Sequence, residues 1–288
     1  MADKVASYHD DPDRLALAQQ MEDNKTHAVK SKFDYAILMD ECTKSGAPYM
    51  LLVEDDVVFL HGWRHRTMKA LGIASVESWE AAHTDWGSVL YLRLFHHEGL
   101  RGWNVESWRR YVGWSVVSTT SSLCALLLAR RFVPSARRHL TRSVVLLVPF
   151  VFTPLLIILY FAAGANCVQP QPEGVHLMPK NACCGQALVF PQTTVTKELL
   201  PLFEKNRWSE SPTDSFIEDY ANAKGGLRWG LTPVVVQHVG STSTYNMDER
   251  LYGNMTPSDI WNYKFEENAP SSLAEEHLRL YGPVMTND

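Results

Sequence analysis

Two long stretches without a charged residue dominate the hydrophobic pattern of this chain, at residues 111–129 and 143–163. As a helix, each stretch is about long enough to cross a bilayer core of roughly 30 Å. The second contains Pro149 and Pro154, which membrane helices tolerate but which would be costly in a buried soluble helix. The pattern therefore predicts two transmembrane helices in tandem. The alternative is a pair of core helices in a soluble domain, where two such segments in tandem are uncommon.

The segment between these stretches, residues 130–142, predicts their topology. It holds five arginines and no acidic residue. Short loops of this composition belong on the cytosolic side of a membrane. A hairpin with a cytosolic tip places both flanks on the lumenal face, where they can form one domain. We therefore predict that residues 1–110 and 164–288 are the two parts of one domain and that residues 111–163 are a transmembrane hairpin in the lipid bilayer.

The two flanks have the pattern of an α/β fold. Apolar positions recur at helical spacing over residues 26–45, and Gly46-Ala47-Pro48 ends that helix. The apolar run Tyr49–Val53 that follows is typical of a buried parallel strand. A helix followed by a buried strand is half of an α/β unit. Four further strands and a helix are predicted, the strands at residues 57–60, 88–95, 186–190 and 233–238 and the helix at residues 213–223.

Three acidic residues, Glu54, Asp55 and Asp56, follow the first predicted strand directly. Ligand sites in open α/β sheets lie at the carboxyl ends of strands, and carboxylate oxygens suit Mg²⁺ or Mn²⁺. Such a cation could hold the diphosphate of a sugar-nucleotide donor. We therefore expect Glu54, Asp55 and Asp56 to form the cofactor site, in which Asp56 binds the metal and Glu54 contacts the nucleotide ribose or the metal shell. The alternative is a solvated turn after a strand.

Two more candidates lie later in the chain. His238 ends an apolar strand and could complete the metal shell as a neutral imidazole, or it could be an ordinary hydrogen-bonded histidine. Asp214 is the first candidate for the base that takes the proton of an acceptor hydroxyl, with Glu218 and Asp219 behind it. The alternative for Asp214 is a helix N-cap, because it stands just before an apolar helical segment.

Composition and small motifs change this picture only slightly. The formal net charge of -5, without a basic stripe, argues against a nucleic-acid partner. Cys167, Cys183 and Cys184 cluster after the hairpin, and a disulfide among them is plausible in an oxidising lumen. Asn24 and Asn254 each begin a glycosylation sequon, one in each flank, which fits a lumenal position of both.

With these features in place, the chain resembles a known family. The resembling segments are Gly46-Ala47-Pro48-Tyr49, Leu52-Val53-Glu54-Asp55-Asp56-Val57, Tyr91-Leu92-Arg93-Leu94-Phe95, Gly102-Trp103, the hairpin, Cys183-Cys184-x-Gln186-Ala187-x-x-Phe190-Pro191 and Pro212-x-Asp214. They are similar to the Golgi transferases that add N-acetylgalactosamine (GalNAc) to glycosylphosphatidylinositol (GPI) anchors, the family of the fourth post-GPI-attachment-to-proteins factor, and most to its fungal members. More distantly, Asp214 with Gln237-His238-Val239-Gly240 resembles branching N-acetylglucosaminyltransferases, in which the corresponding acid is the base.

The resemblance implies a GT-A-type glycosyltransferase domain interrupted by the hairpin. It implies an inverting transfer of GalNAc from UDP-GalNAc to a mannose of the GPI glycan on GPI-anchored proteins. Mn²⁺, or else Mg²⁺, would be the metal, and the catalytic parts would face the Golgi lumen. Arg93 and Trp103 are candidates for acceptor recognition.

Two other functions stay open at this stage. One is transfer of a different sugar, such as N-acetylglucosamine from its UDP form, to a lipid-linked glycan. The other is a non-catalytic membrane protein that binds GPI or a partner on a degenerate transferase fold. It is motivated by the polar start of the chain: family members begin with a membrane anchor and a first nucleotide-binding strand, and we expect the natural chain to extend further at this end. A two-metal phosphohydrolase is disfavoured because the acids are too few and too clustered.

Overall fold

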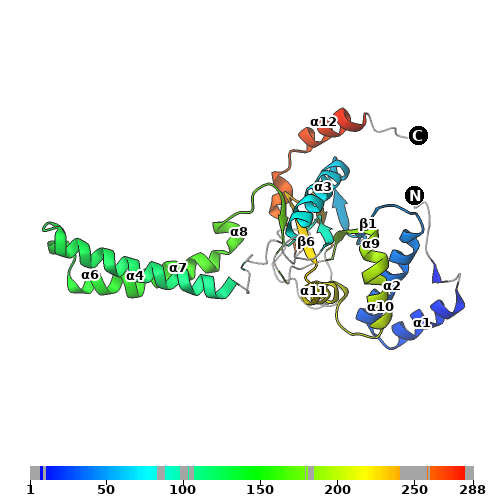
Figure 1. Cartoon of the computed structure of the whole chain (residues 1–288), viewed down its shortest axis with the longest axis horizontal. Coiled ribbons are helices and arrows are strands. Elements are labelled where there is room, and N and C mark those ends of the chain that lie inside the picture. Colours follow the sequence, from blue (N-terminus) through cyan, green and yellow to red (C-terminus); the bar gives the residue numbers. More distant parts are fainter. Residues whose placement is uncertain are drawn as a thin grey trace. The chain divides into compact units, whose positions relative to one another are not determined.

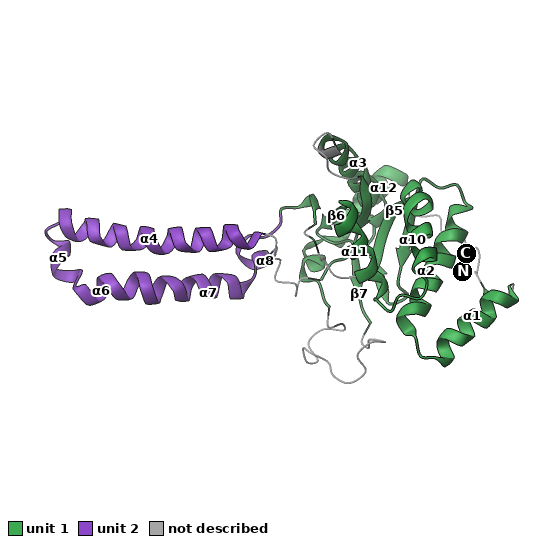
Figure 2. Cartoon of the chain, turned by 60° about the horizontal axis from the view of Figure 1, so that its bottom comes forward, with its two compact units in different colours: residues 1–97, 172–288 green, residues 98–171 purple. Residues whose placement is uncertain are grey.

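The computed structural model describes most of the chain, namely residues 7–8, 11–82, 88–97, 103, 107–178, 180, 185–240, 258 and 260–282. The chain divides into two compact units (Figure 2), unit 1 with residues 1–97 and 172–288 and unit 2 with residues 98–171. Unit 1 is therefore assembled from two stretches that are separated in the sequence by unit 2. The boundaries expected after residues 110 and 163 both fall inside unit 2.

Unit 1 is built on a mixed five-stranded sheet. Its strand order is β1 (Tyr49–Val53), β5 (Ala187–Pro191), β3 (Val89–Arg93), β6 (Leu227–Thr232) and β4 (Gly174–Leu177). Only β3 and β6 run parallel, whereas the other neighbours are antiparallel. A second, two-stranded sheet pairs β2 (Val57–Phe59) with β7 (Val236–His238), so that Val57 lies opposite His238.

Helices pack on both faces of the larger sheet, and the α/β class is confirmed (Figure 1). On one face, Ala70, Leu71 and Ala74 of α3 (Trp63–Ala82) join a core with Val189 and Trp229. The other face is covered by α2 (His27–Thr43), η4 (Val195–Leu199), α10 (Leu200–Lys205) and α11 (Thr213–Lys224). The remaining elements of unit 1 are α1 (Pro12–Asp23), α9 (Gln192–Thr194), η6 (Tyr263–Glu267) and α12 (Pro270–Tyr281).

Most of the predicted elements are present, but the expectation for the first strand was wrong. Strand β1 is not a parallel strand inside the sheet. It lies at the sheet edge and pairs antiparallel with β5. Its uninterrupted apolar run has another cause: Tyr49 and Leu51 pack on the core of one face, whereas Met50 and Leu52 pack on the other. A strand that is covered on both faces needs apolar residues at every position, whatever its pairing direction.

Two strands and several helices of unit 1 were not predicted, among them α3, β4 and the interior strand β6. All six residues of β6 are buried, yet its sequence includes Arg228, Gly230 and Thr232. It therefore lacks the apolar run that marks a buried strand. Arg228 is tolerated there because its guanidinium pairs with Glu218, as described below.

Unit 2 is a helical hairpin. Helix α4 (Trp108–Phe132) lies side by side with a second, antiparallel helical stretch that consists of α6 (Arg142–Leu147), the π-helical turn η3 (Val148–Phe152) and α7 (Thr153–Ala163) (Figure 2). Short helices α5 (Ala136–His139) and α8 (Ala165–Val168) complete the unit. Both stretches, Trp108–Phe132 and Arg142–Ala163, are long and apolar enough to cross a membrane, although two such helices are weak support for a membrane protein.

Candidate metal centre and active site

The acidic turn after β1 is held by backbone hydrogen bonds on both sides. The Glu54 N–H donates to the Gln186 carbonyl, 3.0 Å away, just before β5 begins. The Val239 N–H donates to the Asp56 carbonyl at 2.8 Å, just after β7 ends. The turn therefore connects the larger sheet with the two-stranded sheet. This connection places Glu54 and Asp56 next to His238 at the end of β7.

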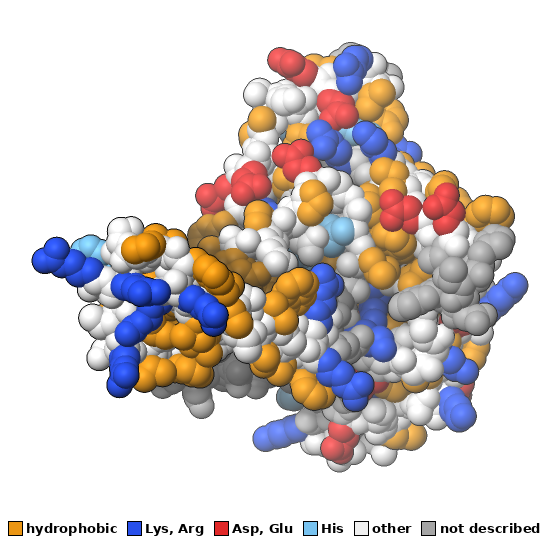
Figure 3. Space-filling view, turned by 60° about the vertical axis from the view of Figure 1, so that its left-hand side comes forward, with side chains coloured by type: hydrophobic (Ala, Val, Ile, Leu, Met, Phe, Trp, Pro, Cys, Tyr) orange, Lys and Arg blue, Asp and Glu red, His pale blue; other side chains and the backbone are white. Residues whose placement is uncertain are grey.

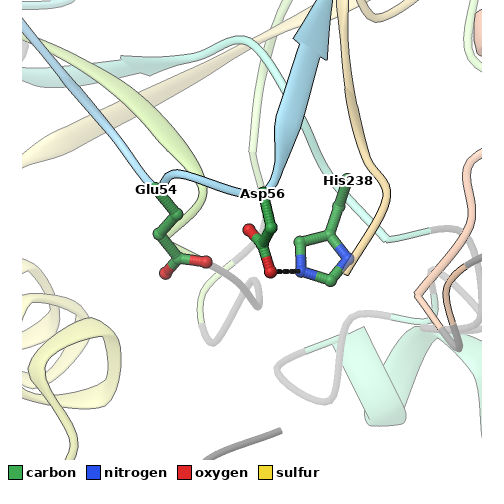
Figure 4. Close-up of side chains that lie close together, drawn as sticks. All are labelled: Glu54, Asp56 and His238. Atoms are coloured by element: carbon green, nitrogen blue, oxygen red, sulfur yellow. Dashed lines mark ion pairs between the residues drawn. The ribbon is translucent and has the colours of Figure 1, made fainter. Parts of the chain in front are cut away.

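Glu54, Asp56 and His238 converge at this point (Figure 4). One ligand atom from each residue lies within 4.8 Å of the others. The His238 Nε2 atom is 3.0 Å from Asp56 Oδ2, and the histidine side chain is nearly buried. Asp56 Oδ1 is buried and has no hydrogen-bond partner among the residues that the structure describes. Buried carboxylate oxygens without a partner are uncommon, so this atom is available to a ligand.

A divalent cation fits this group of side chains. Two carboxylates and one imidazole are a suitable donor set for Mn²⁺ or Mg²⁺. Burial is the main cause that raises the pKa of Glu54 to about 7, and the negative charges of Asp56 and Asp214 raise this pKa further. A hydrogen bond from the Gln186 side chain acts in the opposite direction and lowers the pKa. Carboxylates that repel one another in this way are stabilised together by a bound cation.

Ser258 orients His238, and sequence reasoning missed it. The Ser258 Oγ atom lies 2.6 Å from His238 Nδ1 and accepts a hydrogen bond from the Ile260 N–H at 3.2 Å. Ser258 is 1% exposed. A partner on Nδ1 holds the ring so that Nε2 points toward Asp56, as outer-shell partners do for metal-bound histidines. No motif surrounds Ser258 that could have revealed this role, since the contact forms across 20 residues.

Asp214 also lies at this site, at the start of α11. Pro212 occupies the N-cap position and Asp214 is in the first turn, so the alternative of an N-cap for Asp214 was wrong. The Asp214 Oδ1 atom accepts from the Ser215 N–H at 2.7 Å. A Cβ added to Gly185 would lie 3.7 Å from Asp214 Cβ and 3.9 Å from Glu54 Oε1, so the two residues are neighbours at this site.

Glu218, one turn further along α11, has a different environment. It is buried, and its two carboxylate oxygens accept hydrogen bonds from Arg93 at 2.9 Å and Arg228 at 2.8 Å, with the Tyr91 hydroxyl as a further partner. These bonds connect α11 to β3 and β6. The geometry therefore favours a structural role for Glu218 over the catalytic role considered from sequence. It also places Arg93, which is 1% exposed, inside the fold and away from direct contact with an acceptor.

The other candidate residues lie apart from this group. Asp55 and Asp219 are exposed, and neither belongs to the cluster of three ligands. Trp103 is in unit 2, where its indole N–H donates to the Phe161 carbonyl at 2.9 Å and its ring packs on Tyr111 and Tyr160. Cys167 is exposed, but Cys183, Cys184 and Asn254 lie outside the described residues, so the disulfide and the second sequon stay predictions.

Comparison with known families decides the class of the protein. The model of the family described as GPI-N-acetylgalactosamine transferase PGAP4 matches residues 2–237. The chain belongs to this family. The match includes both acids of the cluster, Glu54 and Asp56, together with Asp214, and it ends one residue before His238. No curated protein and no solved structure matches the chain.

By its description, this family consists of glycosyltransferases that act on GPI. Membership in this family gives the cluster of Glu54, Asp56 and His238 a chemical context, because a glycosyltransferase must hold the leaving group of its donor.

Proposed function

We propose that this protein is a metal-dependent, inverting glycosyltransferase that transfers GalNAc from UDP-GalNAc to a mannose of the GPI glycan. Unit 1 would be its GT-A-type catalytic domain and unit 2 its anchor in the Golgi membrane. The observation that carries the proposal is the convergence of Glu54, Asp56 and His238, with Asp214 beside them, in a member of this family.

The proposed reaction divides the work between the two ends of the site. Glu54, Asp56 and His238 would hold the cation, which when bound neutralises the diphosphate of the donor. Asp214 would accept the proton of the acceptor hydroxyl. The hydroxyl oxygen forms a bond to the anomeric carbon as the bond from that carbon to the UDP oxygen breaks, and the electron pair leaves on UDP. Direct attack of this kind inverts the anomeric centre.

The membrane assignment of unit 2 is supported by how little of its apolar surface is covered. In the most apolar windows of the two helical stretches, 0% and 11% of the residues are buried. Core helices of a soluble domain are mostly buried, so this alternative is disfavoured. Figure 3, which brings the hairpin forward, shows apolar and basic side chains gathered on it. The basic side chains include Arg137 and Arg138 of α5, at the tip between the two stretches.

A transfer assay tests the proposal. The full chain in detergent micelles would receive UDP-GalNAc, Mn²⁺ and a GPI-anchored acceptor, with UDP-N-acetylglucosamine as a competing donor. We expect labelling of the acceptor that chelation of the metal removes and that Asp56→Ala lowers by about 100-fold or more. Asp55→Ala is the matched control, because Asp55 is exposed and outside the cluster. Full activity of Asp56→Ala would overturn the metal assignment, and preferred use of the competing donor would change the sugar.

Glycosylation mapping tests the topology separately. Asn24 is exposed at the end of α1, so its sequon is accessible. We expect Asn24 and Asn254 both to be modified in a eukaryotic host, and both modifications to be lost in the Asn→Gln variants. Modification of Asn254 alone would place the two parts of unit 1 on opposite sides of the membrane during synthesis and would contradict the proposed topology.

A further inference from the structure

The start of helix α11 is not held by a cap of its own. The N-cap residue is Pro212, and no side-chain hydrogen bond caps the helix there. A Ser, Thr, Asp or Asn at this position usually fixes the first turn by such a bond. Asp214, the proposed base, lies in this first turn. Other contacts therefore have to fix the turn, and the same contacts then set the position of Asp214.

Two adjacent residues of α2, Ser31 and Lys32, contact this end of α11. The Lys32 ammonium donates one hydrogen bond to the Ser211 carbonyl, in the loop directly before α11, and another to the Ala28 carbonyl of its own helix at 2.9 Å. The Ser31 Oγ atom lies 2.9 Å from the Thr213 Oγ1 atom, which is hydrogen-bond distance. These contacts tie α2 to the start of α11 across 179 and 182 residues of sequence.

A third contact reaches α11 on the other side of Asp214. The Lys32 Nζ atom lies 5.7 Å from the centroid of the Phe216 ring, which is the distance of a cation–π contact. Phe216 follows Asp214 by two residues, whereas the contacts of the loop and of Thr213 precede it. The first turn of α11 is therefore held to α2 on both sides of the proposed base.

The Lys32 ammonium occupies a buried position at a cost in free energy. Lys32 is 2% exposed, and burial lowers its pKa from the ordinary value of a lysine. A buried ammonium is unfavourable unless it is hydrogen-bonded, whereas an unbranched apolar side chain such as methionine would fill most of the same space without that cost. An apolar side chain could not supply the hydrogen bond to the Ser211 carbonyl. The contribution specific to Lys32 is therefore this link to α11 and not its packing.

We infer that Lys32 is a positioning residue, which holds the start of α11 so that the Asp214 carboxylate lies within reach of the acceptor hydroxyl. This inference rests on the proposed function, in which Asp214 is the base. Proton transfer needs hydrogen-bond distance between base and hydroxyl, and a displacement of about 1 Å can lower the rate by about 100-fold. Ser31 contributes to the same link through Thr213. The three proposed metal ligands lie outside α11, so loss of the link should spare the metal site.

Lys32→Met tests the role of the ammonium. The substitution keeps an apolar stem of similar length and removes the hydrogen-bond donor. We expect kcat for GalNAc transfer to fall about ten-fold, while the KM for the acceptor and the affinity for UDP in the presence of Mn²⁺ stay within about two-fold. Lys44→Met is the matched control, because the Lys44 side chain is exposed at the far end of the same helix. Its kcat should equal that of the unmodified protein.

Ser31 gives a second, smaller test of the same link. Ser31→Ala removes the hydroxyl that meets Thr213, and we expect kcat to fall by a smaller factor than in Lys32→Met. Ser31→Thr keeps a hydroxyl and should retain the activity. Ser31→Ala also makes the test if Lys32→Met fails to fold, which thermal unfolding of each variant would show.

A double variant separates positioning from a general loss of structure. If Lys32 acts through Asp214, then Lys32→Met should lower the residual transfer of Asp214→Asn by less than about two-fold, because the base is already absent. A purely structural role for Lys32 would instead lower the residual transfer by the same factor of about ten. The second result would overturn the inference.

The remaining outcomes separate this inference from the proposed function. Unchanged kcat in both Lys32→Met and Ser31→Ala, alongside normal transfer by the unmodified protein, would overturn the positioning role and leave the proposed function in place. A fall in UDP affinity as large as the fall in kcat would also overturn it, since Lys32 would then support the donor site. Absence of transfer by the unmodified protein with every UDP-sugar tried would overturn the proposed function itself.

Discussion

Gly240 lies so close to Asp56 that a Cβ added to it would be 2.0 Å from Asp56 Oδ2. The same Cβ would be 3.0 Å from His238 Cε1. No real Cβ makes a contact of 2.0 Å, so any side chain at position 240 has to displace the carboxylate. Position 240, two residues after the end of β7, therefore has to be glycine for Asp56 and His238 to lie 3.0 Å apart.

Gly240→Ala should therefore damage the site more than the fold. The Asp56 carboxylate is the end of a side chain that is partly exposed, so it can move aside at little cost in stability. We expect the affinity for Mn²⁺ to fall about ten-fold or more, while the unfolding temperature stays within a few degrees of that of the unmodified protein. Manganese binding would be followed by electron paramagnetic resonance. The matched control is Gly72→Ala, since Gly72 is exposed within α3 and has no atom within 4 Å of an added Cβ. Normal Mn²⁺ affinity in Gly240→Ala would contradict the assignment of Asp56 as a ligand.

Ser258→Ala should weaken the metal site through the histidine. Loss of the hydroxyl removes the partner at 2.6 Å from His238 Nδ1 and frees the imidazole to rotate. Substitution of such outer-shell partners typically lowers metal affinity by about 10- to 100-fold. We expect that loss in a Mn²⁺ titration, with partial recovery in Ser258→Thr, which restores the hydroxyl. An unchanged titration in Ser258→Ala would show that other contacts orient His238.

Asp214→Asn should separate binding from chemistry. The amide keeps the size of the carboxylate but cannot accept the proton of the acceptor hydroxyl. We expect UDP to bind with unchanged affinity in the presence of Mn²⁺, and transfer to fall by about 100-fold or more. Equilibrium titration with UDP and the transfer assay measure the two effects. If UDP affinity also falls, Asp214 supports the donor site and another residue is the base.

Glu218→Ala should destabilise unit 1 strongly. The substitution leaves the guanidinium groups of Arg93 and Arg228 buried without their carboxylate. Removing one partner from a buried ion pair costs about 3–5 kcal/mol of stability. Thermal unfolding would show the loss, and Asp219→Ala, an exposed neighbour on the same helix, should show almost none. A Glu218→Ala protein that unfolds normally yet has lost activity would instead support a catalytic role for Glu218.

Two partly buried histidines, His96 and His176, predict a loss of stability in acid. Burial, with smaller effects of neighbouring positive groups, lowers the pKa of His96 to about 3, and burial also lowers the pKa of His176. The unfolded chain takes up a proton at each imidazole below pH about 6.5, whereas the folded protein does not. Stability is therefore complete above pH 6.5 and declines as the pH falls. From pH 7.5 to 5.5 we expect His96 to lower the free energy of unfolding by about 1 kcal/mol. His96→Gln should flatten this decline in thermal unfolding, and an identical decline would assign it to other groups.

The sequence by itself determined the features that depend on local pattern. The helical spacing over residues 26–45 and 213–223 corresponds to α2 and α11, and the apolar runs around Leu92 and Val189 correspond to β3 and β5. The two uncharged stretches correspond to the two long helical stretches of unit 2. The positions of Asp56 and His238 at the ends of apolar runs also indicated a shared site. These features are readable because periodicity and burial act on residues that are near one another in the chain.

The tertiary structure decided everything that depends on contacts between distant segments. It placed β1 at the sheet edge, added β6 as an interior strand, and paired Glu218 with Arg93 and Arg228. It also brought Ser258 to His238. A serine carries no local signal of such a role, because its sequence context is the same on a surface and in a site. These roles arise only when strand pairing and helix packing bring together side chains that are far apart in the chain, such as Glu218 and Arg93, which are 125 residues apart.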